Sequence, residues 1–118
     1  LWEDQKAREK AASGRAASLL DDVPTGLPAA TRAVKLAKRA ARIGFDWPDV
    51  EGVRAKVDEE LAELDAARRD GDPAATAAEL GDVLFAVANL ARHLGIDPET
   101  ALRGSNARFE RRFRHVER

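Results

Sequence analysis

The chain has 118 residues and a formal net charge of −1 at pH 7, and these two values limit the number of domains and the classes of ligand that are expected. The length suits one domain with its own core. Association with another copy would add to the stability of such a small domain. The absence of cysteine excludes disulfides and thiolate catalysis, and it makes a cytoplasmic setting the default expectation. We see no signal peptide and no apolar run long enough to cross a bilayer, so we expect no membrane partner.

Charge is distributed unevenly along the chain. Acidic side chains concentrate in residues 58–82, and basic ones in residues 32–42 and 108–118. This separation suits a ligand that carries both a metal ion and phosphate, whereas binders of duplex DNA usually have a broadly basic surface. We therefore expect no direct binding of nucleic acid. Because the chain begins with Leu1, we interpret it as a piece of a longer protein.

The N-terminal part, residues 1–27, is expected to form a short helix over about 2–12 and a linker loop. The rest, residues 28–118, is expected to form one helical domain that three connectors divide. Each connector contains a glycine that can end a helix in a left-handed conformation, an aspartate that can cap the next helix, and a proline that suits its first turn. These connectors are residues 44–48, 71–73 and 95–98.

The connectors and the 3.6-residue apolar spacing predict four helices and no strands, and hence an all-α four-helix bundle. The predicted helices are residues 28–43, 48–70, 73–94 and 98–116. In the second of them, one apolar stripe consists of Val53, Val57, Leu61 and Leu64. In the third, we expect a broad buried face made of Leu80, Val83, Leu84, Val87, Leu90, Ala91 and Leu94.

Two acidic clusters lie beside these apolar faces. Glu59, Glu60 and Glu63 belong to the second predicted helix, and Glu79 and Asp82 to the third. Carboxylates three residues apart on a helix point the same way, so packing the two helices together would merge the clusters. At about 100° per residue, Glu60 falls nearest the apolar edge of its helix and Glu79 borders the apolar face of the next.

Glutamates on a helix are more often a solvated face, paired with a lysine or arginine four residues later. None of the five acids has such a residue at that position, so no local basic partner is expected to compensate them. Carboxylates that gather in this way repel one another unless a cation lies among them. Oxygen ligands without cysteine or histidine favour Mg²⁺ or Mn²⁺, and the clusters therefore predict metal-assisted chemistry on a phosphate-bearing ligand.

The clusters also carry a resemblance. Residues 56–63 (KVDEELAE) and 79–85 (ELGDVLF) resemble the signature of the MazG family of all-α nucleoside triphosphate pyrophosphohydrolases. Three further blocks fit the same family: residues 35–47 (KLAKRAARIGFDW), 89–95 (NLARHLG) and 106–113 (NARFERRF). The chain looks most like the C-terminal domain of long, tandem-domain MazG proteins. The resemblance implies Mg²⁺-dependent hydrolysis of a (d)NTP to (d)NMP and pyrophosphate, in nucleotide-pool cleansing, by a homodimer or a dimer of dimers.

The resemblance also implies roles for individual residues. The metal-binding acids are matched by Glu60, Glu63, Glu79 and Asp82. Lys56 matches an accessory position, and Arg108 and Arg112 match basic positions used towards the phosphates. We expect one or two Mg²⁺ ions to orient the phosphates and lower the pKa of a bound water, with Glu59 as the candidate general base. An outer ligand of the metal, or a partner of a lysine, would look the same as Glu59 in sequence.

Other residues keep two interpretations. Asn89 is expected to contact sugar or base, or equally to make a hydrogen bond between helices. Phe45 and Trp47 are expected to anchor a connector in the core, with stacking on a nucleobase as the alternative. His93 shows no metal-binding spacing. Long MazG proteins often carry a lysine and a glutamate where this chain has Ala75 and Ala78, and this favours the alternative of a non-catalytic dimerisation or nucleotide-sensing module.

Overall fold

The structure is a computed structural model that describes residues 17–118, and within this range it contains helices and no strands. This confirms the all-α class. The helices are α2 (Ala29–Ala41), α3 (Val50–Arg69), α4 (Pro73–His93) and α5 (Pro98–Val116). They lie close to the predicted ranges, although α2 ends earlier and α3 begins later than expected. The helix predicted over residues 2–12 lies outside the described residues.

The connectors work largely as their sequence predicts. Glycine ends each of the first three helices with a positive φ, at Gly44, Gly71 and Gly95. Aspartate side chains cap the following helices by accepting a backbone N–H from the first turn; the three caps are Asp49, Asp72 and Asp97. The first connector differs from expectation, because Asp49 rather than Asp46 caps α3 and Pro48 precedes the helix.

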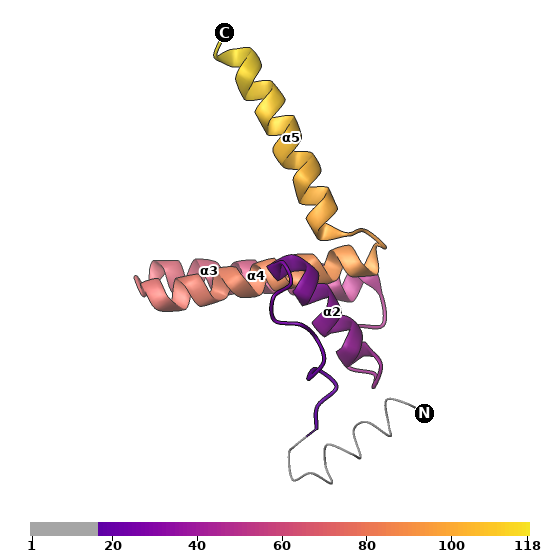
Figure 1. Ribbon diagram of the computed structural model, residues 1–118. Coiled ribbons are helices and arrows are strands. Elements are labelled where there is room, and N and C mark those ends of the chain that lie inside the picture. Colours follow the sequence, from indigo (N-terminus) through magenta and orange to yellow (C-terminus); the bar gives the residue numbers. More distant parts are fainter. Residues whose placement is uncertain (1–16) are drawn as a thin grey trace.

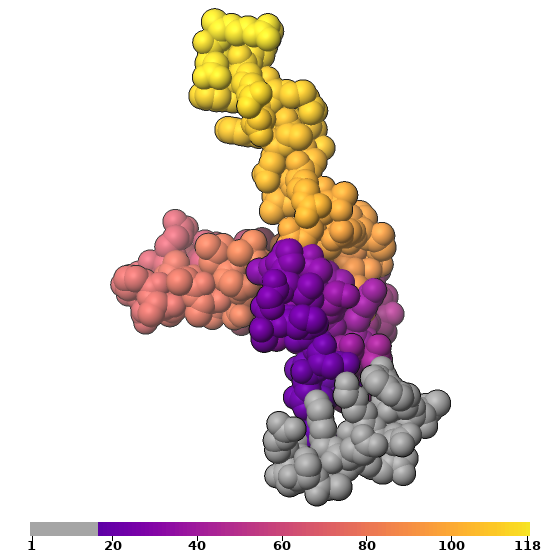
Figure 2. Space-filling view, in the orientation of Figure 1, coloured from indigo at the N-terminus to yellow at the C-terminus, as the bar shows by residue number. Residues whose placement is uncertain are grey.

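The helices pack around α4. Helices α3 and α4 form an antiparallel pair, α2 packs on α4, and α5 leaves the group at an angle (Figure 1). The space-filling view shows α5 as a projecting arm (Figure 2). A small set of buried apolar side chains forms the core, with the side chain of Val53 almost fully enclosed: Val23, Val53, Val57, Val83, Ala86 and Ala88.

The broad face expected to be buried on α4 is covered only in part. Val83 is buried, but Leu80, Leu84 and Val87 are 48%, 61% and 44% exposed. Helix α5 contains no buried residue at all within the described chain. The expectation was wrong here because apolar spacing shows which residues share a face and does not show what covers that face.

Helix α4 also corrects the expectation about membranes. It is long and apolar enough, by length and composition alone, to cross a membrane, with a hydropathy of 1.3 over 18 residues. The same residues include Glu79 and Asp82, and the helix packs against α2 and α3. A core helix can be equally apolar, but only 17% of this stretch is buried in the described chain, so its two carboxylates and its packing, more than its burial, distinguish it from a membrane helix.

Candidate metal centre and adjoining pocket

The acidic clusters come together because a short connector folds α4 back along α3. Gly71, with φ of 70°, ends α3, and the Asp72 carboxylate accepts a hydrogen bond from the Ala75 N–H at 3.1 Å. The middle of α3 therefore lies beside the first half of α4 (Figure 1). This places Glu60 of α3 next to Glu79 of α4, as the sequence predicts.

Three carboxylates form the centre of the site. Glu60, Glu79 and Asp82 each offer one oxygen, and these oxygens lie within 4.8 Å of one another. Glu60 is only 6% exposed. The Oε2 atoms of Glu60 and Glu79 are both buried, and neither accepts a hydrogen bond from any residue that the structure describes. Buried carboxylate oxygens without partners are costly, so this group fits a cation.

Lys56 is the basic partner that the sequence analysis missed. Its Nζ lies 3.0 Å from Glu60 Oε1 and 3.3 Å from Glu59 Oε1. The hydrogen bond to Glu60, and then that to Glu59, raises the pKa of Lys56. The expectation of no local compensation was wrong because the partner precedes the acids by three and four residues. One lysine still leaves the group of three carboxylates negatively charged.

Two of the expected acids lie at the edge of this group. Glu63 is outside the three-carboxylate group, but the charge of Glu60, then desolvation and the charge of Glu79, raise the pKa of Glu63. It is therefore within electrostatic reach of the group. Glu59 has a side chain that is 58% exposed, and the partner that the structure gives it is Lys56. This arrangement matches the lysine-partner interpretation of Glu59 as well as that of a base.

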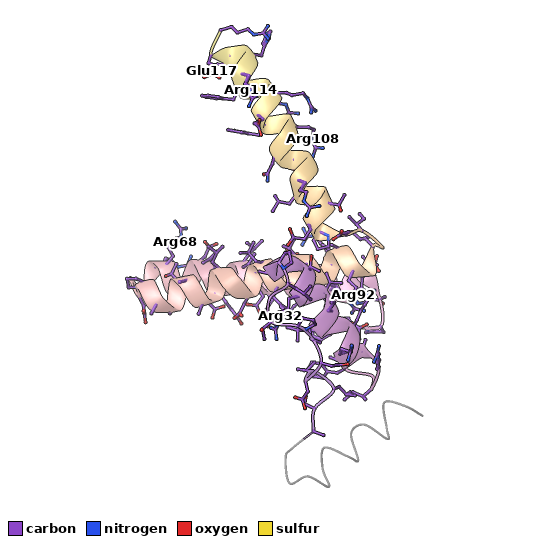
Figure 3. All side chains as sticks on the ribbon, viewed as in Figure 1. Arg32, Arg68, Arg92, Arg108, Arg114 and Glu117 are labelled. Carbon is purple, nitrogen blue, oxygen red and sulfur yellow. The ribbon has the colours of Figure 1, made fainter. Side chains whose placement is uncertain are left out.

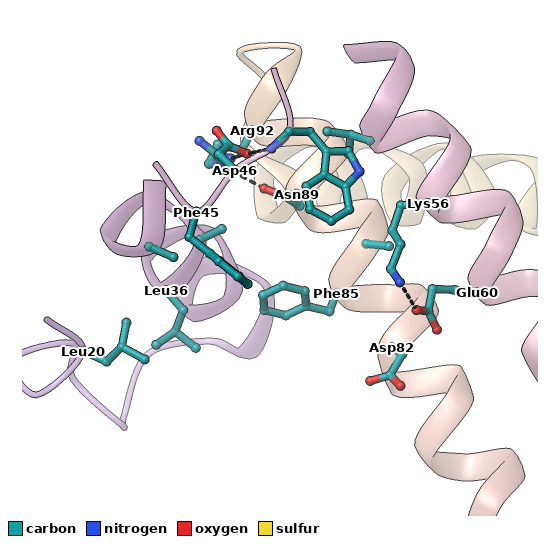
Figure 4. A pocket seen from close by; sticks show the side chains of 15 residues that line it. Leu20, Leu36, Phe45, Asp46, Lys56, Glu60, Asp82, Phe85, Asn89 and Arg92 are labelled. Atoms are coloured by element: carbon teal, nitrogen blue, oxygen red, sulfur yellow. Dashed lines mark hydrogen bonds and ion pairs between the residues drawn. The ribbon is translucent and has the colours of Figure 1, made fainter. Parts of the chain in front are cut away.

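A pocket of about 390 Å³ adjoins the acidic group, between α2, α3, α4 and the first connector. Figure 4 shows Lys56, Glu60 and Asp82 at one end of it, with aromatic and aliphatic side chains along the wall. The aromatic members are Phe45, Trp47 and Phe85. Phe45 is 73% exposed, so the expectation that it anchors the connector in the core is wrong, and the ring stands at the pocket instead.

A polar network lines another side of the pocket, away from the acidic group (Figure 4). Asp46 Oδ1 accepts hydrogen bonds from Arg92 at 2.7 Å and from the Trp47 N–H at 2.8 Å, and it lies 2.8 Å from His93 Nε2. These contacts, the Arg92 hydrogen bond above all, lower the pKa of Asp46 to about 2 against the opposing effect of burial. Arg92 Nε also donates to Asn89 Oδ1 at 2.8 Å.

This network orients Asn89, which lines the same pocket. Arginine has only donors, so the amide oxygen of Asn89 must face Arg92. The amide N–H₂ group then remains as a donor for a ligand. Asn89 thus lines the pocket, and its hydrogen bond joins it to Arg92 of its own helix, not to another helix as the alternative expected.

The two arginines expected at the phosphates do not join the acids within one chain. Helix α5 contacts α2 and α4 but not α3 among the described helices. Arg108 lies well along α5, away from the α3–α4 pair, as Figure 3 shows, and it donates to Ser105 Oγ at 3.0 Å. Arg112 is one turn further out and is exposed.

The network at Asp46 was missed in the sequence. Asp46 and Arg92 are 46 residues apart, and no local pattern links them. The spacing around His93 predicts no metal binding, and the structure gives this side chain a different role, in contact with Asp46. In the sequence, these two segments are linked only by the family resemblance, since residues 35–47 and 89–95 are both among its blocks.

Comparison with known proteins identifies the family of the chain. The family model described as phosphoribosyl-ATP pyrophosphohydrolase matches residues 32–108. The nucleoside triphosphate pyrophosphohydrolase of Escherichia coli (strain K12) is 49% identical over 119 residues, which cover 99% of this chain and 45% of that protein.

Two further relatives align along nearly the whole chain. The nucleoside triphosphate pyrophosphohydrolase/pyrophosphatase MazG of Thermotoga maritima is 41% identical over 98% of this chain and 44% of its own length. The uncharacterized protein YabN of Bacillus subtilis is 46% identical over 98% of this chain and 24% of its own length. The chain thus spans less than half the length of these relatives. It belongs to the family described as phosphoribosyl-ATP pyrophosphohydrolase, and along nearly its whole length it is similar to part of MazG-type nucleoside triphosphate pyrophosphohydrolases.

Proposed function

We propose that the chain is a Mg²⁺-dependent nucleoside triphosphate pyrophosphohydrolase domain, which converts a (d)NTP to (d)NMP and pyrophosphate. The observation that carries this proposal is the group of three carboxylates, two with buried unpartnered oxygens, at the end of an aromatic pocket. The names of the E. coli and T. maritima relatives support the same activity. A cytoplasmic role in clearing unwanted nucleotides is part of the proposal.

The donor set favours a hard divalent cation. Glu60, Glu79 and Asp82 would hold Mg²⁺, with Mn²⁺ as the alternative, because clustered carboxylates suit these ions. Glu63 is the proposed fourth ligand, since the charge of Glu60 already acts on it. When bound, the cation would neutralise oxygens of the triphosphate and lower the pKa of the attacking water.

The pocket is proposed to hold the nucleoside. Its volume of about 390 Å³ lies within the ~300–1,000 Å³ that is usual for small-molecule pockets. The rings of Phe45, Trp47 and Phe85 offer apolar surface for a base. The N–H₂ group of Asn89, oriented by Arg92, would donate to an acceptor on the base or sugar.

In the proposed reaction, the oxygen of water attacks the α-phosphorus, the bond from this phosphorus to the α–β bridging oxygen breaks, and pyrophosphate leaves. Glu59 would accept the proton of the water. Lys56, which contacts Glu59 and Glu60, would position both carboxylates and contact the phosphates. Such reactions are accelerated mainly by positioning and charge stabilisation.

A product assay tests the proposal. Purified protein is given each ribo- and deoxynucleoside triphosphate with Mg²⁺ or EDTA, and also phosphoribosyl-ATP, because the matching family model carries that name. We expect Mg²⁺-dependent release of pyrophosphate, abolished by Glu60→Gln and Asp82→Asn. The control Asp65→Asn lies on the exposed side of α3, paired with Arg68, and should keep the activity.

Other outcomes would contradict specific parts. Release of single orthophosphates would mean that the wrong bond was assigned, and no metal-dependent release from any substrate would favour the non-catalytic module. For Glu59, a general base predicts a loss of about 10²–10⁴-fold in kcat and of the acid limb of the pH profile in Glu59→Gln. A small loss with an unchanged profile would leave Glu59 only as a partner of Lys56.

A further inference from the structure

A second pocket, of about 360 Å³, lies between α2, the end of α4 and the connector that leads into α5. Ala37 and Ala40 of α2 line the pocket beside the acidic group, whereas Lys35 and Lys38 line the second one. At about 100° per residue, these two pairs lie on opposite sides of α2. Arg92 lines both pockets, but the acidic group lines only the first. We call the second one the basic pocket.

The basic pocket receives the positive charge of α2 that the chain does not pair. This helix has four basic side chains and no acidic one. Arg32 donates to the Pro24 carbonyl oxygen at 3.1 Å, and Arg39 forms an ion pair with Asp22. Lys35 and Lys38 are exposed, and neither has an acidic partner within residues 17–118. Both ammonium groups therefore remain available to a ligand.

The acidic side chain that lines the basic pocket is already engaged. Asp97 Oδ1 accepts a hydrogen bond from the Glu99 N–H at 3.1 Å, and its Oδ2 accepts one from the Thr100 hydroxyl at 2.8 Å. These bonds cap the start of α5. One carboxylate held in a cap does not balance two lysines, so the pocket keeps a net positive charge.

The arrangement of donors indicates a phosphate group. Lys35 and Lys38 are three residues apart, which places their Cβ atoms about 5–6 Å from each other on one face of the helix. A phosphate monoester carries a charge of about −1.5 to −2 at pH 7, so it can contact both ammonium groups, whereas a carboxylate has one charge to share. Thr31 lies one turn before Lys35 and adds a hydroxyl donor.

The remainder of the pocket has room for more than an inorganic ion. Its volume lies within the ~300–1,000 Å³ that is usual for small-molecule pockets. Val34 and Ile96 also line it and offer apolar surface to the body of a ligand.

We propose that the basic pocket binds a phosphorylated small molecule, whose phosphate group lies between Lys35 and Lys38 and accepts hydrogen bonds from both. This site is additional to that of the triphosphate substrate. The phosphates of the substrate belong with the cation at Glu60, Glu79 and Asp82, none of which lines the basic pocket. The site therefore exists whether or not the chain hydrolyses a triphosphate.

A titration followed by NMR tests the proposal without any measurement of activity. The ¹⁵N-labelled protein is titrated in EDTA with glycerol 3-phosphate, because the acidic group without a cation disfavours a phosphate there. We expect saturable shifts of the backbone amide signals of Lys35, Lys38 and Gly95, all described by one Kd. Glycerol, and sodium chloride at matched ionic strength, should not reproduce them. Equal shifts with either of these, or shifts centred on Glu60 and Asp82, would overturn the proposal.

A pair of variants with the same change in charge completes the test. Lys35→Gln/Lys38→Gln should weaken the binding of glycerol 3-phosphate at least about tenfold, because it removes two charged donors. Arg54→Gln/Arg68→Gln removes two positive charges from the exposed side of α3 and should leave the Kd unchanged. The amide spectra without ligand show whether each variant is folded. An unchanged Kd in the lysine variant, or an equal loss in both variants, would refute binding by these lysines.

Discussion

Glu79→Gln should stabilise the metal-free protein, although it removes a residue that we propose for the site. The oxygens of Glu60, Glu79 and Asp82 lie within 4.8 Å of one another. Two unit charges at this distance repel by about 3.5 kcal/mol at an effective dielectric constant of 20, and by about 1 kcal/mol in water. Asp82 is exposed, so the lower value applies to its pair with Glu79. The glutamine amide also brings a donor to the buried, unpartnered oxygen of Glu60.

We therefore expect the variant to gain about 1 kcal/mol, or about 4 °C in Tm for a domain of this size, when EDTA is present. Mg²⁺ should make the wild type the more stable of the two proteins. A cation that binds only the folded state at 100 times its Kd adds about 2.7 kcal/mol, and the wild type, with the complete ligand set, should receive most of this. The sign of the difference in Tm between the two proteins is thus expected to invert on addition of Mg²⁺.

The assay is thermal unfolding by circular dichroism at one fixed protein concentration, in EDTA and in a Mg²⁺ series. Asp65→Asn, an exposed acid of α3 outside the group, serves as the control and should change Tm little in both buffers. A variant that melts below the wild type in EDTA would refute the repulsion argument. An equal Mg²⁺ shift in both proteins would show that Glu79 is not a ligand.

Two further substitutions test the far end of the pocket. Asp46→Asn should cost about 2 kcal/mol in urea unfolding, because it weakens charge-assisted hydrogen bonds from Arg92. The pKa of Asp46 is lowered from 3.8 to about 2, so the stability that its carboxylate contributes is present above pH 3.8 and is lost as the pH falls through 2. The difference in unfolding free energy between variant and wild type should therefore vanish near pH 2. A difference that stays constant down to pH 2 would contradict this explanation. Gly52→Ala should destabilise by about 1–2 kcal/mol despite the better helix propensity, because its Cβ would lie 2.9 Å from Trp47 Cδ1. A blue or red shift of Trp47 emission in a Trp2→Phe background should accompany the loss, and a stabilised variant would show that the ring moves freely.

Much of the fold could be predicted because its signals are local. A glycine with positive φ, an aspartate cap and a proline all act within a few residues, so the ends of α3 and α4 followed from the connector at residues 71–73. The meeting of Glu60 with Glu79 followed from the same connector, because a tight turn between two helices makes them antiparallel neighbours. The prediction for the first connector was wrong because this connector is followed by a second aspartate, Asp49, which caps α3. Asp46 instead binds Arg92, and this contact between distant residues cannot be read from the local sequence.

The rest of the site could not be predicted because it depends on contacts between distant segments. Nothing within the span of a turn links Asp46 to His93, or Phe45 to the pocket that Phe85 also lines. Lys56 is within local reach, since it precedes Glu59 and Glu60 by three and four residues, whereas a pattern with the basic residue four positions after each acid does not include it. An ion pair on a helix forms in either direction, although the orientation with the acid first is the better one.

The exposed apolar side chains of α4 and α5 and the unpartnered carboxylate oxygens of the site pose the same physical problem. Within residues 17–118, Leu84 and Phe113 remain exposed, and the buried Oε2 atoms of Glu60 and Glu79 have no hydrogen-bond donor. An apolar stripe needs protein to cover it, and a carboxylate group needs positive charge. Under the proposed function, a cation would supply the positive charge that the carboxylates lack. If the cation and the triphosphate bind at one place, each should increase the affinity of the site for the other by the same factor.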